Sequence, residues 1–177
     1  MTLISKARHI RIAIFDVDGV LTDGGLYYAE AGDAMKAFDV RDGMGIKLLQ
    51  DAGVEIAIIT SRRAPSVRLR AEDLGISRVQ QGVADKLAGF EALLAATGIA
   101  PDAAAFLGDD LVDLPVLRRC GFAATVADAP AVLKRHADYV TRAAGGRGAA
   151  REFCELILHS RGMLAASTRR FLDRAGH

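Results

Sequence analysis

Two aspartates lie close together near the start of the chain, in the stretch Asp16-Val17-Asp18-Gly19, directly after an apolar run over residues 10–15. Two carboxylates at the end of a buried strand form an anionic site, which needs a cation or raised pKa values to be stable. A calcium-binding EF-hand loop would need an oxygen ligand and then a glycine where Val20 and Leu21 stand. The pair is therefore typical of a catalytic or magnesium site and not of an EF-hand.

A second acidic group follows another apolar run, over residues 103–107. It comprises Gly108-Asp109-Asp110 and, three residues later, Asp113. If both runs are neighbouring parallel strands, their carboxyl ends meet at one edge of the sheet. Asp16, Asp18 and Asp109 can then converge on one hard cation with oxygen ligands, and we expect Mg²⁺.

A hydroxyl and an ammonium lie between the acidic groups, at Thr60 and Lys86. Such groups hold and neutralise an oxyanion in phosphoryl transfer. A carboxylate and a phosphate repel each other by roughly 4 kcal/mol at 4 Å and an effective dielectric near 20, so a metal ion and Lys86 are needed together. We predict that Asp16 forms an aspartyl-phosphate, and that Asp18 protonates the leaving alkoxide and later activates water.

Several cations follow other candidate strand ends and could bind a second anionic group of the substrate. Arg41, Arg62 and Arg70 come from different loops, and Arg41 precedes a glycine-rich helix start that could cradle an anion. Each of these residues, taken alone, is also typical of a solvated surface. Together with Lys86, they would suit a substrate that bears both a phosphate and a carboxylate.

The elements that must position these residues alternate between apolar runs and helical patterns. We expect strands over 10–15, 54–60, 103–107 and 122–126, and helices over 42–52, 65–74, 85–97, 111–119 and 149–159. Continuous apolar runs are typical of strands that are covered on both faces. The order predicts an α/β fold with a doubly wound parallel sheet. A β-hairpin is expected at about residues 26–38, inserted after the first strand.

Composition excludes several classes of function. The chain of 177 residues carries 23 Lys and Arg against 22 Asp and Glu, so no general positive field exists to hold nucleic acid or a membrane surface. The two cysteines have no metal-ligand spacing and are expected to be reduced, which is typical of a cytoplasmic protein. We expect one domain over residues 1–162, followed by a basic, partly disordered tail over residues 163–177.

The stretches DVDGVLTDG and GDDLVD, with Thr60 and Lys86, resemble the four motifs of the haloacid dehalogenase superfamily. KAFDVRDGMGIKLL and GGRGAAREFCELIL extend the resemblance, to about residue 158, to the 3-deoxy-D-manno-octulosonate 8-phosphate phosphatases, a branch without a cap domain. The resemblance implies a Mg²⁺-dependent, Rossmann-like phosphatase of lipopolysaccharide biosynthesis. It also implies a homotetramer in which a neighbouring subunit covers the active site in place of a cap.

The resemblance also assigns site residues. It implies metal ligands at Asp16, at Asp18 through its backbone carbonyl, and at Asp109. The implied contacts to the sugar acid and its phosphate are Asp39, Val40, Arg41, Asp42, Gly43, Lys47, Arg62, Arg70, Lys86 and Asp110.

Three positions depart from the residues that are more usual in the family. Asp39, Lys47 and Ser61 stand where the family more often has Asn, Arg and Gly. Since a lysine cannot reproduce the forked contact of an arginine, these departures concern substrate contacts more than the chemistry at phosphorus.

Two alternatives remain open from the sequence. The chain could act on a related nine-carbon ulosonate phosphate, or serve as a non-catalytic oligomerisation partner of a synthetase. It could also be a phospho-accepting receiver domain, which combines acids, a hydroxyl, a lysine and Mg²⁺ on a similar sheet. A receiver needs neither the second acid at Asp18 nor the hairpin, so both features favour the enzyme.

Overall fold

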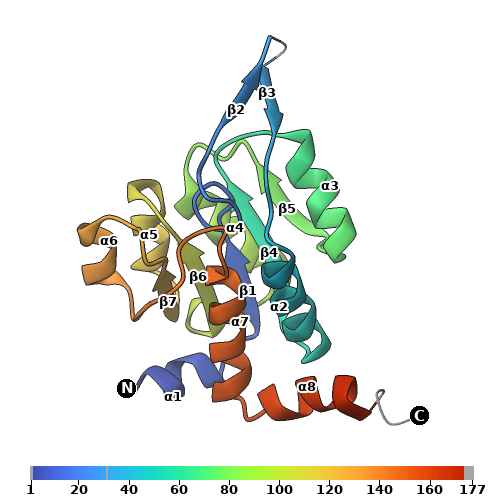
Figure 1. Cartoon of the computed structure of the whole chain (residues 1–177). Coiled ribbons are helices and arrows are strands. Elements are labelled where there is room, and N and C mark those ends of the chain that lie inside the picture. The colour runs from blue at the N-terminus through green and yellow to red at the C-terminus, as the bar shows by residue number, and fades with distance from the viewer. Residues whose placement is uncertain (1, 31, 174–177) are drawn as a thin grey trace.

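Six parallel strands form the central sheet in the computed structural model, which describes residues 2–30 and 32–173 (Figure 1). Their order is β5-β4-β1-β6-β7-β8, so the first strand lies near the centre. The strands are β1 (Ile12–Phe15), β4 (Glu55–Thr60), β5 (Arg78–Gln81), β6 (Ala104–Gly108), β7 (Phe122–Thr125) and β8 (Tyr139–Val140). The predicted doubly wound parallel sheet is thereby confirmed.

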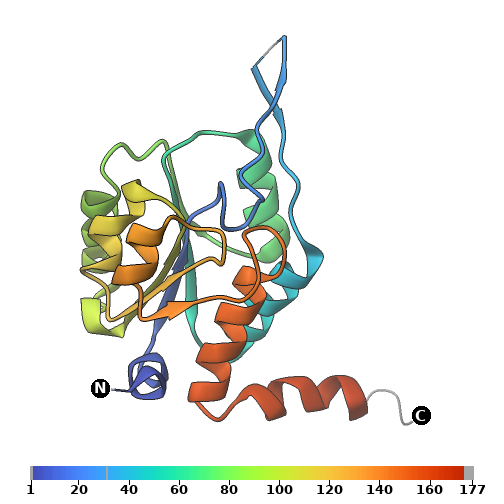
Figure 2. The same cartoon turned by 60° about the vertical axis from the view of Figure 1, so that its left-hand side comes forward.

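Helices cover both faces of this sheet (Figure 2). One face carries α2 (Val40–Asp51), α3 (Pro65–Leu74) and α7 (Ala149–Ser160). The other carries α4 (Lys86–Thr97), the short α5 (Leu114–Leu117) and α6 (Ala131–His136). The right-handed crossovers of parallel strands favour this division, because the chain runs from β1 to the edge strand β5, crosses back to β6 beside β1 and then continues to the opposite edge at β8.

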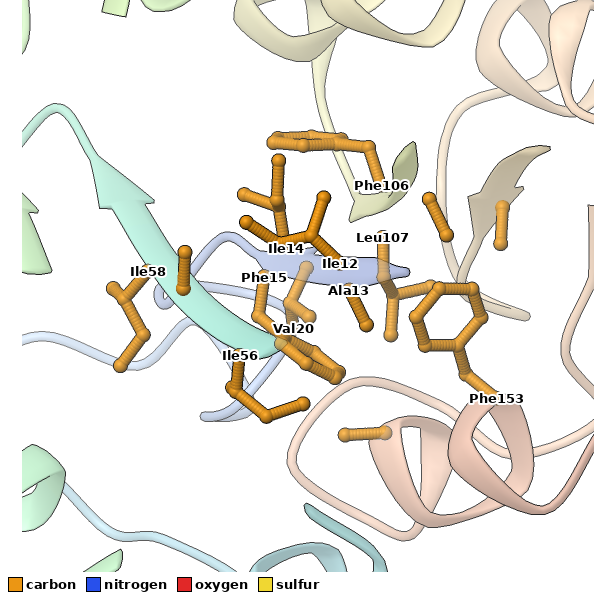
Figure 3. Close-up of a cluster of buried hydrophobic side chains, with 14 of the residues drawn as sticks. Ile12, Ala13, Ile14, Phe15, Val20, Ile56, Ile58, Phe106, Leu107 and Phe153 are labelled. Atoms are coloured by element: carbon orange, nitrogen blue, oxygen red, sulfur yellow. The ribbon is translucent and has the colours of Figure 1, made fainter. Parts of the chain in front are cut away.

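The core lies on both sides of β1 (Figure 3). Ile12 and Ile14 point toward Phe106 on one face, while Phe15 points toward Phe153 of α7 on the other. The rings of Phe15 and Phe153 meet edge to face with centroids 5.5 Å apart, and Phe122 stacks on Phe153 at 5.9 Å. Burial of both faces explains why the strand is apolar without alternation.

The hairpin is confirmed: β2 (Tyr27–Ala29) pairs antiparallel with β3 (Gly32–Met35). Ala31, at its tip, lies outside the described residues. The hairpin projects away from the sheet in both views (Figures 1 and 2), and Tyr27, Tyr28 and Met35 are at least half exposed. In the described part of the chain, this hairpin is the only insertion between β1 and α2, so no cap domain is present there.

Within the segment for which we expect a partly disordered tail, residues 164–173 form helix α8 (Leu164–Asp173). Met163 and Leu164 pack against the core at the end of α7, whereas Phe171 and Leu172 are exposed. Residues 174–177 lie outside the described residues. A further short helix, α1 (Leu3–Arg8), precedes the sheet. No helix among the described residues is long and apolar enough to cross a bilayer.

Phe153→Ala should lower the free energy of unfolding by about 3–5 kcal/mol, because the substitution leaves a cavity between two other phenylalanines. Urea unfolding followed by circular dichroism measures this change. Leu69→Ala, at a position that is 57% exposed on α3, is the control and should change stability by less than about 1 kcal/mol. Equal losses in the two variants would contradict this description of the core.

Candidate active site

Successive elements deliver their polar residues to the carboxyl edge of the sheet. Asp16 directly follows β1, Thr60 is the last residue of β4, and Asp109 directly follows β6. Lys86 is the first residue of α4, whose N-terminus is capped by the Asp85 carboxylate. The register of β1 with β4 and β6 brings these positions together, so residues distant in sequence form one site.

These residues surround a cavity of about 250 Å³. Seven residues predicted from the sequence line it: Asp16, Asp18, Thr60, Arg62, Lys86, Asp109 and Asp110. Gly24, Ser61 and Val112 complete the lining. The structure thus brings the acids, the hydroxyl and the ammonium into one hollow.

The Lys86 ammonium lies at the base of the cavity between two carboxylates. Its Nζ is 2.8 Å from Oδ2 of Asp16 and 2.6 Å from Oδ1 of Asp113. All three side chains are at most 7% exposed. Burial would lower the pKa of Lys86, but the two carboxylates outweigh this and raise it, so the ammonium remains charged.

Both metal-ligand candidates among the side chains have raised pKa values. Burial, followed by the charge of Asp113 and opposed by Lys86, raises the pKa of Asp16 to about 6. Burial, together with Asp16 and Asp113, raises the pKa of Asp109 to about 8. Ionising both carboxylates would therefore place more negative charge in the site than Lys86 alone can neutralise, and a bound cation would stabilise the ionised pair.

Asp113 belongs to the second acidic motif, but sequence reasoning assigned it no role. Its Oδ1 binds Lys86, and its Oδ2 accepts the backbone N–H groups of Asp109 at 2.9 Å and Asp110 at 3.4 Å. Asp113 thus fixes both Lys86 and the Asp109 loop.

Carboxylate oxygens of Asp16, Asp109 and Asp113 lie within 4.8 Å of one another, a spacing that could hold a metal ion. Asp113 already has three donors, whereas Oδ1 of Asp16 is buried and has no hydrogen-bond partner among the described residues. Asp16 and Asp109 are therefore the better ligands. The residues fit a hard cation, because the donors are oxygens and one of them is unpaired.

Asp18 also lines the cavity and is linked to the hairpin. Its Oδ1 is 2.5 Å from Nζ of Lys36, and its Oδ2 is 3.8 Å from Nε of Arg62. Arg62 in turn donates to the hydroxyl of Tyr28, at 3.0 Å. Sequence reasoning missed Lys36, although it begins the stretch KAFDVRDG on which the family resemblance rests.

The remaining predicted substrate residues lie outside this cavity, around the start of α2. Asp39 caps α2 and pairs with Arg41 at 2.7 Å, and Val40 is 79% exposed. Arg70 donates to the carbonyl of Asp39 and lies over the Phe38 ring.

Asp42 and Gly43 of this second group have contacts within the fold, whereas Lys47 is exposed. The Asp42 carboxylate accepts the backbone N–H groups of Gly148 and Arg151 at the start of α7. Gly43 packs against Arg70, and Lys47 is exposed on α2. Within one chain, then, the predicted site residues form two separate groups.

Comparison with known proteins agrees with this geometry. The sequence pattern of the haloacid dehalogenase-like hydrolases matches residues 76–153. The 3-deoxy-D-manno-octulosonate 8-phosphate phosphatase KdsC of Escherichia coli K12 is 49% identical over 92% of this chain and 86% of its own. The chain belongs to this phosphatase family. Membership excludes the receiver-domain alternative.

Solved structures of family members have the same fold. The Yersinia pestis phosphatase is 47% identical, with a TM-score of 0.90 over 92% of this chain and 88% of that one. The Moraxella catarrhalis phosphatase, solved with a magnesium ion, a phosphate ion and a KDO molecule, is 41% identical, with a TM-score of 0.93 over 96% of this chain and 97% of that one.

The raised pKa of Asp109 predicts how the stability of the metal-free protein depends on pH. The folded state keeps a proton on Asp109 up to about pH 8, whereas an unfolded aspartate loses it near its ordinary pKa of 3.8. Raising the pH across this window therefore destabilises the folded state. Urea unfolding in chelator should show a smaller decline in stability between pH 5 and pH 9 for Asp109→Asn than for the wild type. Parallel declines would show that Asp109 does not titrate in this range.

Proposed function

We propose that this chain is a Mg²⁺-dependent phosphatase that hydrolyses 3-deoxy-D-manno-octulosonate 8-phosphate through an aspartyl-phosphate. The observation that carries the proposal is the state of Asp16. One of its oxygens is held by Lys86, and the other is buried in the cavity with no partner among the described residues. Such an oxygen is available to a metal ion or a phosphorus atom. The product of this reaction is the sugar acid that the Moraxella relative holds.

Asp16 is the nucleophile because it is the carboxylate at the base of the cavity. Lys86 fixes one oxygen of Asp16 and brings positive charge to the place where the phosphate must bind. Thr60, buried at the end of β4, lines the same cavity and can donate to a phosphate oxygen.

A Mg²⁺ ion would be held by Asp16, by Asp109 and by the backbone carbonyl of Asp18. When bound, it supplies positive charge that offsets the repulsion between carboxylate and phosphate. The unpaired oxygen of Asp16 and the raised pKa of Asp109 support this assignment.

Asp18 is placed to move the proton. It lies two residues after the nucleophile, lines the same cavity and has a more exposed side chain than Asp16, as a group that meets the leaving group of a bound phosphate ester requires. It would protonate the sugar alkoxide and then deprotonate the water that hydrolyses the phosphoenzyme. Its contacts with Lys36 and Arg62 hold its carboxylate in this position.

The cavity is too small to enclose the whole substrate. Its volume of about 250 Å³ lies below the roughly 300–1000 Å³ of pockets that bury a small ligand, so the phosphate end fits inside and the sugar extends outward. A covering surface is needed to limit water at the acyl-phosphate stage. We propose that a neighbouring copy supplies it in a homotetramer.

The hairpin is the proposed contact surface of that tetramer. A two-stranded hairpin is marginally stable by itself, and exposed tyrosine and methionine side chains are typical of an interface. Assembly through the hairpin would also let the exposed cations at the start of α2, Arg41 and Lys47, approach a neighbour's sugar acid.

We place the reaction in the cytoplasm, as a step of lipopolysaccharide biosynthesis. Cys120 and Cys154, the free cysteines of the described chain, support a reducing compartment.

Asp16→Asn should abolish turnover with every substrate, because the nucleophile is lost. Asp18→Asn should lower kcat/KM, which reports the transfer of the phosphoryl group to Asp16 and not the later hydrolysis, by about 10²–10⁴-fold with the sugar phosphate and by less with p-nitrophenyl phosphate, whose leaving group needs no proton. Steady-state assays with Mg²⁺ or with chelator measure both effects. Hydrolysis by Asp16→Asn, or full wild-type activity in chelator, would contradict the mechanism. Preference for a nine-carbon ulosonate phosphate would instead correct the substrate.

Tyr27→Asp combined with Met35→Asp should dissociate the tetramer and lower kcat/KM at least tenfold. These residues pair across the two strands and are 50% and 65% exposed. Light scattering coupled to gel filtration measures the mass. Leu172→Asp, on the exposed side of α8 away from the hairpin (Figure 1), is the control and should leave both quantities unchanged. A fully active wild-type monomer would refute the proposed assembly.

A further inference from the structure

The segment that joins β8 to α7 contacts the loop that carries Asp18. We name residues 141–148 the brace loop. Its Gly146 donates its backbone N–H to the carbonyl of Val20 at 2.9 Å, and its Arg147 lies 3.4 Å from the Asp23 carboxylate. It thus borders the catalytic loop along residues 20–23.

Gly145 is the point of closest contact. A Cβ atom added there would collide with the carbonyl of Gly19 and lie 3.2 Å from that of Thr22. Its φ does not lie in the left-handed region, since no positive φ occurs at this residue. Space, and not backbone conformation, therefore requires a glycine at this position.

Gly19 makes a similar contact on its other side. A Cβ added at Gly19 would collide with the carboxylate of Asp109. Gly145, Gly19 and Asp109 are therefore packed in series, with the backbone of Gly19 between the brace loop and a proposed metal ligand. The packing of these three residues therefore sets the distance between the loop that carries Asp16 and Asp18 and the loop that carries Asp109.

The brace loop is itself firmly anchored. The Glu152 carboxylate accepts the backbone N–H groups of Arg142 and Ala143 at 3.0–3.1 Å and the hydroxyl of Tyr139 at 2.5 Å. Asp128 accepts the N–H of Gly145 at 3.1 Å. At the far end, Asp42 accepts the N–H of Gly148 at 3.3 Å. The hydrogen bonds to Glu152, Asp128 and Asp42 hold the brace loop in place, so the loop cannot move away from Gly19.

We infer that the brace loop is a positioning device for the metal site, in which Gly145 sets the place of the Asp18-Gly19 backbone relative to Asp109. This inference rests on the proposed function only in requiring that the site binds Mg²⁺. Neither Gly145 nor Glu152 touches the cavity or the reacting atoms. They act through the backbone of the catalytic loop, as outer residues around metal ligands commonly do.

Gly145→Ala tests this inference, with Gly53→Ala as the matched control. Gly53 has a φ of +79° and no atom within 4 Å of an added Cβ, and it lies just before β4, at the opposite edge of the sheet. Gly53→Ala should therefore lower the Tm without affecting the site. Isothermal titration calorimetry measures Mg²⁺ binding to the whole chain, independently of turnover.

The expected result is Mg²⁺ affinity at least tenfold weaker in Gly145→Ala and within twofold of the wild type in Gly53→Ala. Wild-type affinity in a folded Gly145→Ala protein would overturn the inference. If Gly145→Ala does not fold, Glu152→Gln replaces it, with at least threefold weaker binding expected and unchanged binding overturning the inference. A wild type that binds Mg²⁺ without hydrolysing the 8-phosphate would refute the proposed function and leave this test intact.

Discussion

The site depends on one buried ammonium shared by two buried carboxylates. Lys86 lies within 2.8 Å of both Asp16 and Asp113, and removing any one of the three would leave an uncompensated charge in the protein interior. Asp113 is fully buried, and its other oxygen accepts a backbone N–H group of the Asp109 loop. The contacts that neutralise these buried charges therefore also hold Asp16 and the Asp109 loop in fixed positions relative to each other.

Chemistry and recognition occupy different parts of the molecule. The sheet edge holds the groups that act on phosphorus, and its rigidity comes from strands buried on both faces. The hairpin and the start of α2 carry exposed side chains that can adapt to a partner, namely Tyr27, Tyr28, Met35, Arg41 and Met44. In the proposed assembly, Asp18 joins the two parts, because its carboxylate contacts Lys36 of the hairpin as well as Arg62 at the edge.

Strong local patterns in the sequence predicted most of this arrangement. The apolar runs before Asp16 and Asp109 located β1 and β6, and the glycines at 75 and 98 located the ends of α3 and α4. The edge strands β5 and β8 were missed, since three of the four residues of β5 are polar and β8 has only two residues. The role of Asp113 and the Gly145 contact could not be predicted, because both depend on distances between segments far apart in the sequence.

The central claim is that Asp16 receives the phosphoryl group beside a metal ion held by Asp16 and Asp109. A crystal structure with Mg²⁺ and beryllium fluoride, a mimic of an acyl-phosphate, tests it most directly. The account predicts beryllium bonded to an oxygen of Asp16, Mg²⁺ coordinated by Asp16, by Asp109 and by the backbone carbonyl of Asp18, and Asp113 still paired with Lys86. Beryllium on another residue, or Mg²⁺ coordinated by Asp113 in place of Asp109, would contradict it.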